Sequence, residues 1–237
     1  MIRVLIRPGG VTVGQRGDLL EGEAHHLRVR RAADGESVEL RDGEGLIAIG
    51  RLVREGKTWV PDVIQAERAS RPPELTLAVG AGDRDRFAWV VEKATELGVT
   101  SVIPLESERA AGVASRVRTQ HLARLRRHAL EAVKQCGSAW ATRVEDPVPL
   151  GEFLARPLAG QGWVADPNGG AVPAVIGESP VTIVIGPEGG LTPEELERLQ
   201  GAGYAPVSLA PHTLRFETAA IAAAAAAAAG RLRGNDD

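Results

Sequence analysis

The chain has 237 residues, 43% of them hydrophobic, and a formal net charge of −3, which is the composition of a globular protein able to bury a core. No run approaches the roughly 18 apolar residues that a membrane span requires, and the basic start MIRVLIRPGG lacks the apolar core of a secretory signal. Cys136 is the only cysteine, which excludes an intramolecular disulfide and a cysteine-based metal cage. We therefore expect a cytoplasmic protein with no membrane segment and no bound metal.

The first 70 or so residues predict short strands separated by turns. The expected strands are 2–7, 37–41, 46–53 and 58–64, with turns at Asp34-Gly35, Asp42-Gly43 and Glu55-Gly56. Short strands at this spacing are typical of a small β-barrel. Pro72 and Pro73 then stiffen the chain and prevent continuous strand pairing, so we place a domain boundary between residues 1–71 and 72–237.

Beyond this boundary, apolar strands alternate with helices. Strands are expected at 75–80, 99–105, 162–166, 181–186 and 205–209, and helices at 84–97, at 119–135, after Thr192 and in the alanine-rich C-terminal segment. Strands that are almost entirely apolar and separated by helices predict a parallel sheet covered on both faces.

Two of these helices have recognisable ends. Thr192 is a good N-cap, Pro193 suits the first helical position, and Glu195 completes a capping box. The last helix is expected to open at Glu217 or Thr218 and to close at Gly230, and it contains eight consecutive alanines. A face of alanines allows another helix or a partner subunit to approach closely.

Basic residues are concentrated in one part of this acidic chain. Between Arg109 and Lys134 there are seven Lys or Arg residues and a single acid, Glu131. Such a block indicates either nucleic-acid binding or simply a solvated helix face.

The common phosphate-binding motifs are absent from the sequence. There is no Walker-type loop. The segment Gly80-Ala81-Gly82-Asp83-Arg84-Asp85 imitates a dinucleotide fingerprint, but Asp85 would place a carboxylate where the pyrophosphate must lie. His25 and His26 are adjacent, so in a strand they would point to opposite faces and could not chelate one metal.

Two loops carry the strongest sign of a ligand site. Gly186-Pro187-Glu188-Gly189-Gly190 follows an apolar strand and precedes a helix, at the edge where open α/β sheets bind ligands. Its glycines allow close backbone approach, although a tight connecting loop would also explain them. The segment 208–219 again joins a strand end to a helix start, so the two loops are expected to form one pocket.

These segments resemble the RsmE family, the 16S ribosomal RNA (uridine-N3)-methyltransferases of the SPOUT superfamily. The resemblance rests on IGPEGGLTPEE (185–195) followed by LxxxxLRFETA (209–219). HHLRVRR (25–31) and GESVELRDGEG (35–45) resemble the family's N-terminal PUA-like β-barrel, and the segments 92–110 and 131–137 resemble its interior signatures.

The resemblance implies a homodimer of α/β chains, each with a parallel sheet that ends in a C-terminal trefoil knot. It implies S-adenosyl-L-methionine as cofactor, bound in the knot, and 16S ribosomal RNA or the small ribosomal subunit as partner. The implied cofactor-binding residues are Asp166, Gly186, Glu188, Gly189, Gly190, Leu209, Ala210, Leu214 and Arg215.

The sequence departs from the family pattern at several positions. Ala210, His212 and Thr213 stand where the pattern has glycine, arginine and isoleucine. Ala210 is small enough to keep backbone access to an adenosine, whereas the missing arginine removes a phosphate contact. Lys134 replaces a common acid and Ser138 a common arginine.

Methyl transfer to the N3 atom of uridine requires stabilisation of the anion that develops when N3 loses its proton. We expect Arg215 to supply it, with Glu217 or Thr218 either orienting Arg215 or simply capping the helix. RNA contacts are expected from Arg7, His25, Arg28, Arg30, Arg31, Arg116, Arg124 and Arg127. The alternative function is that of a non-catalytic RNA-binding ribosome-assembly factor.

Overall fold

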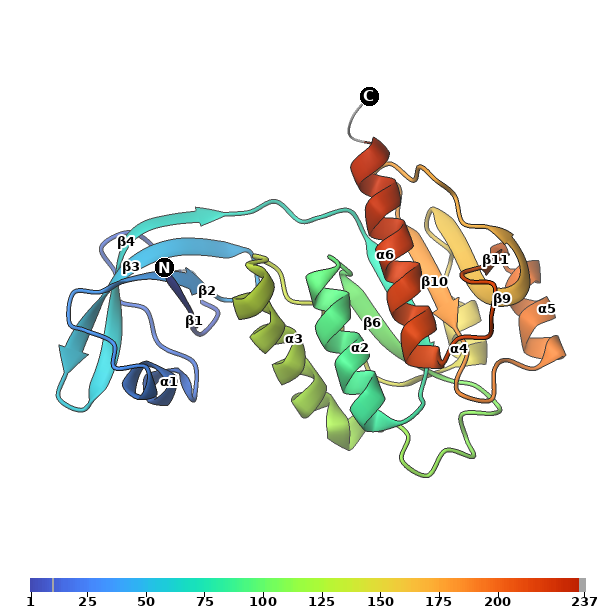
Figure 1. Cartoon of the computed structure of the whole chain (residues 1–237), viewed down its shortest axis with the longest axis horizontal. Coiled ribbons are helices and arrows are strands. Elements are labelled where there is room, and N and C mark those ends of the chain that lie inside the picture. Colours follow the sequence, from blue (N-terminus) through green and yellow to red (C-terminus); the bar gives the residue numbers. More distant parts are fainter. Residues whose placement is uncertain (10, 235–237) are drawn as a thin grey trace. The chain divides into compact units, whose positions relative to one another are not determined.

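A computed structural model describes residues 1–9 and 11–234 of the chain (Figure 1). These residues form two compact units. Unit 1 comprises Met1–Arg71 and Leu130–Ala141, and unit 2 comprises Pro72–Ala129 and the chain from Thr142 onward. The segment Leu130–Ala141, which we expected in the second domain, therefore groups with the N-terminal residues.

Unit 1 is built around a four-stranded sheet. Its elements are β1 (Ile2–Leu5), α1 (Glu23–Val29), β2 (Ser37–Arg41), β3 (Leu46–Glu55) and β4 (Thr58–Arg68). The strands lie in the order β1-β2-β3-β4, with β1 parallel to β2 and the other pairs antiparallel. Isolated pairs between Ile6 and Leu19 and between Arg16 and Asp62 extend the pairing beyond the outer strands. The sheet thus curves toward the barrel that the strand spacing predicts.

Helix α1 is a correction to the sequence analysis, which predicted only strands and turns before residue 70. Its seven residues bury Leu27 in the unit 1 core. A helix of two turns is too short to display a helical period, so its apolar pattern could not distinguish it from a strand. His25 and His26 consequently lie on a helix and both are exposed.

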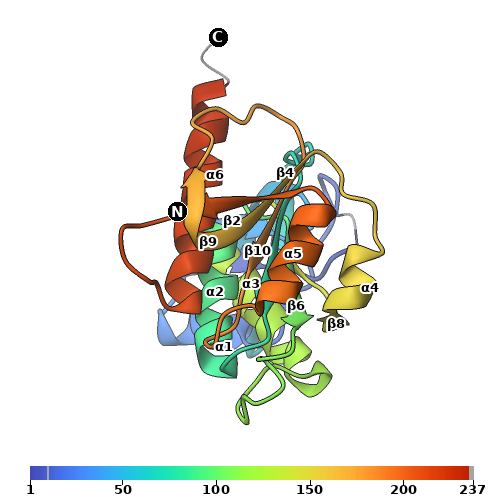
Figure 2. The same cartoon turned by 90° about the vertical axis from the view of Figure 1, so that its right-hand side faces the viewer.

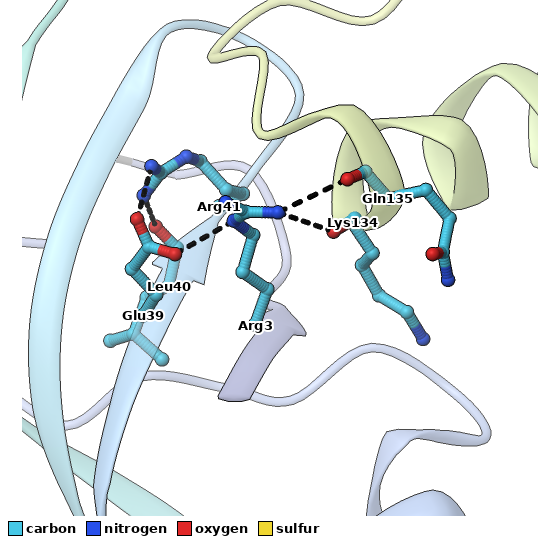
Figure 3. Close-up of polar contacts among 6 residues, drawn as sticks. All are labelled: Arg3, Glu39, Leu40, Arg41, Lys134 and Gln135. Atoms are coloured by element: carbon cyan, nitrogen blue, oxygen red, sulfur yellow. Dashed lines mark hydrogen bonds and ion pairs between the residues drawn. The ribbon is translucent and has the colours of Figure 1, made fainter. Parts of the chain in front are cut away.

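The segment Leu130–Ala141 is attached to unit 1 by specific polar contacts. The guanidinium of Arg3 donates to the backbone carbonyls of Lys134 (3.0 Å) and Gln135 (3.2 Å), which belong to the last turn of a helix (Figure 3). A helix leaves these carbonyls unpaired and partly negative, so a cation stabilises them. Burial alone would raise the pKa of Glu39, but Arg41 and Arg3, both bonded to its carboxylate, lower it.

Trp140 provides a second attachment. Its indole N–H donates to the carbonyl of Ser70 at 3.0 Å, and the guanidinium of Arg71 lies 4.6 Å from its ring centroid. A side chain at Gly45 would collide with the ring, because its Cβ would lie 2.5 Å from the ring atom Cζ2.

Unit 2 is a parallel α/β sheet. Its strands are β5 (Leu75–Gly80), β6 (Ser101–Glu106), β7 (Arg143–Val144), β8 (Val148–Pro149), β9 (Gln161–Ala171), β10 (Val181–Ile185) and β11 (Tyr204–Ser208). Its helices are α2 (Arg84–Glu96), α4 (Leu150–Leu154), α5 (Pro193–Gly201) and α6 (Phe216–Gly234), together with the first half of α3 (Leu122–Cys136, after a 3₁₀ turn at Thr119–His121), whose second half belongs to unit 1. The strand order is β11-β9-β10-β5-β6-β7, β8 also pairs with β6, and every pair is parallel, as the sequence predicts.

The sheet of unit 2 is covered on both faces. Helices α2 and α6 lie on one side and α5 on the other (Figure 2). β5 and β10 are almost wholly buried, as the apolar runs predict. In α6 the residues Ala220, Ala223, Ala224 and Ala227 are completely buried, so one alanine face is used within the unit itself.

Helix α6 does not end at Gly230 as expected, but continues to Gly234. Gly230 instead allows a close contact, since a Cβ there would lie 2.8 Å from the Cδ1 atom of Ile176. None of the helices in the described part of the chain is long and apolar enough to cross a membrane.

Candidate functional site

A pocket lies beside three adjacent strands of unit 2, at the carboxyl ends of β10 and β11 and at the middle of β9, where the pairing of β9 with β11 shifts register. We call it the edge pocket. Its wall comes from residues 165–167 of β9, from the loops that follow β10 and β11, and from the first residues of α6. It is lined by Ala165, Asp166, Pro167, Ile185, Gly186, Pro187, Glu188, Gly190, Leu191, Val207, Leu209, Ala210, His212, Thr213, Leu214, Phe216 and Ala219. This is the sheet edge at which the sequence predicted a ligand site.

The GPEGGL loop (186–191) forms one wall of the edge pocket. The N–H of Gly190 donates to the carbonyl of Pro187 at 2.8 Å and closes a tight turn. Gly190 has a φ of 72°, in the left-handed region that glycine enters without a steric penalty. Immediately after the loop, the capping box between Thr192 and Glu195 opens α5, which confirms the predicted helix start.

The loop between β5 and α2 supports the GPEGGL loop from behind. A Cβ at Gly80 would lie 2.3 Å from the backbone nitrogen of Pro187, and one at Gly82 would lie 2.6 Å from a carboxylate oxygen of Glu188. The Glu188 carboxylate accepts the N–H of Asp83 at 2.9 Å. The glycines that imitate a dinucleotide fingerprint therefore make room for another part of the protein.

Asp83 links this support to helix α2. Its carboxylate accepts the backbone N–H groups of Asp85 and Arg86 as the N-cap of α2, and the Ser115 hydroxyl donates to it at 2.7 Å. The Ser115 hydrogen bond, followed by that of the Arg86 N–H, holds the pKa of Asp83 below its ordinary value.

Arg109 holds the GPEGGL loop from another side. Its guanidinium donates to the carbonyls of Gly189 at 2.6 Å and of Leu191 at 3.3 Å. The neighbouring residue Glu108 donates its backbone N–H to the carboxylate of Glu195 at 2.8 Å. Because Arg109 packs over Gly189, this glycine faces the arginine and does not line the pocket.

The residues predicted to bind the cofactor largely come together. All of them line the edge pocket except Gly189 and Arg215. His212 and Thr213, two departures from the family pattern, also line it. Asp166 lies in the irregular middle of β9, where its carboxylate accepts the N–H of Asn168 at 2.8 Å.

The residues predicted to be catalytic lie beside the pocket and outside its lining. Arg215 and Thr218 are exposed, whereas Glu217 is buried at 9% exposure. The Glu217 carboxylate lies 3.6 Å from the guanidinium of Arg86 in α2, and its second oxygen has no hydrogen-bond partner. Among the described residues, Glu217 thus has an ion pair with Arg86 and none with Arg215.

The predicted RNA contacts fall into both units. In unit 1, Arg7 forms an exposed ion pair with Asp18 (3.1 Å), and Arg30 lies 3.9 Å from Glu36. In unit 2, Arg124 pairs with Asp85 at 3.1 Å. The others are His25, Arg28, Arg31 and Arg127, which are exposed, and Arg116, which is half-buried.

Several residues that shape the site were missed by the sequence analysis. Gly80, Gly82, Asp83 and Arg109 act through contacts with residues about 80 to 105 positions away along the chain. The one signal in the sequence is the run Gly80-Ala81-Gly82, which resembles a nucleotide motif but lacks its third glycine. Over residues 1–9 and 11–234, no group of three or more His, Cys, Asp or Glu side chains could hold a metal ion.

Comparisons with known proteins agree with this architecture. Residues 69–228 match the RNA methyltransferase domain family, and residues 19–58 match the RNA methyltransferase PUA domain family. The ribosomal RNA small subunit methyltransferase E of Aquifex aeolicus is 31% identical over 216 residues, which are 87% of this chain and 93% of the relative. The Bacillus subtilis protein of the same name is 28% identical over 84% of each chain.

A solved structure extends the similarity to the fold. The ribosomal RNA small subunit methyltransferase E of Neisseria gonorrhoeae, crystallised with S-adenosyl methionine, superimposes with a TM-score of 0.84 at 29% identity. The superposition covers 95% of this chain and 96% of the other. Fold and pocket together define an RNA methyltransferase with an attached PUA domain. The chain belongs to the ribosomal RNA small subunit methyltransferase E family.

Proposed function

We propose that this chain transfers a methyl group from S-adenosylmethionine to the N3 atom of a uridine in 16S ribosomal RNA. Relatives that span most of the chain carry the name ribosomal RNA small subunit methyltransferase E, and the Neisseria gonorrhoeae protein was crystallised with the methyl donor. Ribosomes are assembled in the cytoplasm, so we place the protein there.

The observation that carries this proposal is the charge of the edge pocket. Its lining includes two acidic residues, Asp166 and Glu188, of which Glu188 bonds its carboxylate to the Asp83 N–H behind the loop, and it includes no lysine or arginine. Such a wall suits a ligand with a sulfonium cation and disfavours a pyrophosphate. Leu209, Leu214 and Ile185 add apolar surface for an adenine ring. The residues present therefore fit S-adenosylmethionine.

Bound S-adenosylmethionine would supply an activated methyl group for in-line transfer to a ring nitrogen. The protein contributes mainly the orientation of the two reactants. The uridine N3 must lose its proton, and we assign the stabilisation of the developing negative charge to Arg215. Glu217 anchors the first turn of α6 through Arg86. We therefore assign Glu217, together with Thr218, a role in positioning Arg215.

RNA would be bound by residues of both units, with residues 1–71 as the RNA-binding domain and residues 72–237 as the methyltransferase domain. The support is the PUA-type match of residues 19–58 and the row of arginines from Arg28 to Arg31. In this proposal Arg116, Arg124 and Arg127 contact the RNA near the edge pocket.

We propose in addition that the protein works as a homodimer and that its C-terminal segment is knotted, as in the family it belongs to. On the second face of α6, Ile221, Ala222, Ala225 and Ala229 are only half-buried within the chain. An apolar face of this kind is suited to a symmetric contact with a second copy. Sedimentation at micromolar concentration tests the dimer, and a monomer would contradict it.

The function is tested with purified protein, S-adenosylmethionine and small ribosomal subunits or 16S ribosomal RNA. Nucleoside mass spectrometry should find N3-methyluridine only when both substrates are present. A protein that binds the RNA but shows neither methylation nor a shift in melting temperature with S-adenosylmethionine would be a ribosome-assembly factor.

A further inference from the structure

Unit 1 contains a hollow of about 570 Å³ that is separate from the edge pocket. It lies between the carboxyl end of α1 and the β3–β4 hairpin, and we call it the α1 hollow. It is lined by Arg28, Arg31, Ala32, Arg54, Lys57 and Trp59. Four of these six residues are cations, and the group contains no acid.

The four cations of the α1 hollow lack carboxylate partners. Within residues 1–9 and 11–234, no ion pair involves Arg28, Arg31, Arg54 or Lys57. Of the carboxylates beside Arg54, that of Glu55 pairs with Arg16, and that of Asp34 accepts the backbone N–H of Arg54 at 2.8 Å. Four unpaired cations around one hollow repel one another, and an anion that enters between them relieves this repulsion.

Trp59 gives the hollow a rigid wall. Its ring is 9% exposed and belongs to the unit 1 core, and the guanidinium of Arg54 lies 5.9 Å from the ring centroid. This cation–π contact holds Arg54 at the hollow. Because Arg54 lies over the ring, the arrangement favours a charged group over a stacked base.

The backbone at Arg31 supports a role for its side chain. Helix α1 ends in a Schellman motif, in which the N–H of Arg31 donates to the carbonyl of Arg28 (3.0 Å) and that of Ala32 to the carbonyl of Leu27 (2.9 Å). Arg31 has a φ of 58° and is the one non-glycine residue in the described part of the chain with a positive φ. Glycine fits this position with less strain, so the arginine is held here against a conformational cost.

We propose that the α1 hollow binds a phosphate group of the RNA backbone. The inference rests on the proposed function, which makes RNA the substrate, and it assigns Arg31, Arg54, Lys57 and Arg28 as the phosphate ligands. Guanidinium and ammonium groups donate to phosphate oxygens, and a phosphate contact positions RNA without reading its sequence. In this proposal the hollow holds the RNA at a point within unit 1.

Arg31→Gly distinguishes a role of Arg31 in RNA binding from a role in stability. A residue that binds RNA should lower the affinity when it is replaced and leave the melting temperature unchanged or higher, whereas a residue that stabilises the fold should lower the melting temperature. The full-length variant should have an equal or higher melting temperature, since glycine relieves the left-handed strain. Its affinity for a polyuridine oligonucleotide should fall about fivefold, and the salt dependence of binding should decrease by about 0.7 in logarithmic slope. Lys57→Gln, at the tip of the hairpin, should show the same two effects on binding.

Arg51→Gln is the matched control. Arg51 is an exposed cation of β3 that lies outside the lining of the hollow. It should change affinity and salt slope less than Lys57→Gln does. Equal effects of the two variants, unchanged binding by Arg31→Gly, or wild-type protein without affinity for the oligonucleotide would each overturn the proposal. Polyglutamate that competes as well as the oligonucleotide would also overturn it.

Binding of S-adenosylmethionine is measured in parallel by calorimetry. The hollow variants should bind the methyl donor as the wild type does. If the wild type bound RNA in the hollow but neither bound S-adenosylmethionine nor methylated ribosomal RNA, the proposed function would fail and the phosphate site would stand. If the hollow variants methylated ribosomal RNA and kept the full salt dependence of binding, the proposed function would stand and the phosphate site would fail.

Discussion

The ammonium group of Lys134 lies 2.6 Å from the carboxylate of Glu23, and both side chains are almost completely buried in unit 1. Lys134 stands where the family pattern commonly has an acid, and its buried partner explains this departure within the present chain. Burial alone would lower the pKa of Lys134, but hydrogen bonds to Glu23 and then to Glu131 raise it. The pair helps to attach the segment Leu130–Ala141 to unit 1.

Lys134→Met should destabilise the protein by about 3 kcal/mol, because it leaves the Glu23 carboxylate buried without a counter-charge. The double variant Glu23→Leu with Lys134→Met should recover most of this loss, since the uncompensated charge is gone. Chemical denaturation measures both. Lys93→Met is the control, because Lys93 forms more exposed pairs with Glu92 and Glu96 and should cost less than about 1 kcal/mol. A larger loss for the double variant than for Lys134→Met would contradict this account.

Gly190→Val should abolish binding of S-adenosylmethionine while the protein stays folded. The valine would be strained at a φ of 72° in a loop that lines the edge pocket, and its Cβ would lie 3.8 Å from the guanidinium of Arg109, which holds this loop. Gly177→Val imposes the same type of strain, at a φ of 63°, outside the pocket lining. Calorimetry should show that Gly177→Val retains affinity. Unchanged affinity of Gly190→Val would remove this residue from the site.

Gly80→Ala should both destabilise unit 2, by about 2 kcal/mol, and weaken binding of S-adenosylmethionine. Its Cβ would lie 2.3 Å from the backbone nitrogen of Pro187, so the GPEGGL loop must move. Gly201→Ala has open space around its Cβ and should leave binding intact, with a gain in stability of up to about 1 kcal/mol in α5. Similar effects of the two substitutions on thermal melting and calorimetry would argue against this support of the loop.

Arg109→Ala should lower the affinity for S-adenosylmethionine about tenfold, because the carbonyls of Gly189 and Leu191 lose a charged donor and the loop is held less firmly. Arg118→Ala removes an exposed arginine nine positions further along the chain and serves as the control. Isothermal titration at matched ionic strength distinguishes them. If both variants lost affinity equally, the effect would be one of general charge.

Tyr204 is the single tyrosine of the chain, so an absorbance titration reports on it alone. Burial raises the pKa of its hydroxyl to about 12. In denaturant the midpoint should return to about 10. Because the folded pKa is the higher one, the corresponding stability is complete below pH 10 and is lost as the pH rises from about 10 to about 12. A midpoint near 10 in the native protein would contradict the burial of Tyr204.

The longer elements of unit 2 and the presence of a site at its sheet edge followed from the sequence, because these features depend on local patterns, whereas the short elements β7, β8 and α4 were not predicted. Apolar runs with intervening helices predicted the parallel sheet, and Thr192 with Glu195 predicted the start of α5. The glycine-rich loop after β10 indicated ligand access. The methyl donor and the uridine came only from the family resemblance, since no periodicity encodes them.

The tertiary structure alone determined which residues that are far apart in the chain lie in contact. In the sequence Gly80 resembles part of a nucleotide motif, but in the structure it makes room for the backbone of Pro187. Gly230 resembles a helix end, but in the structure it makes room for the side chain of Ile176. The segment Leu130–Ala141 reads as part of a long helix and its continuation, yet Glu23 and Arg3 bind it to unit 1. Local propensity acts over a few residues, whereas packing and buried charge are satisfied by partners that only the fold brings together.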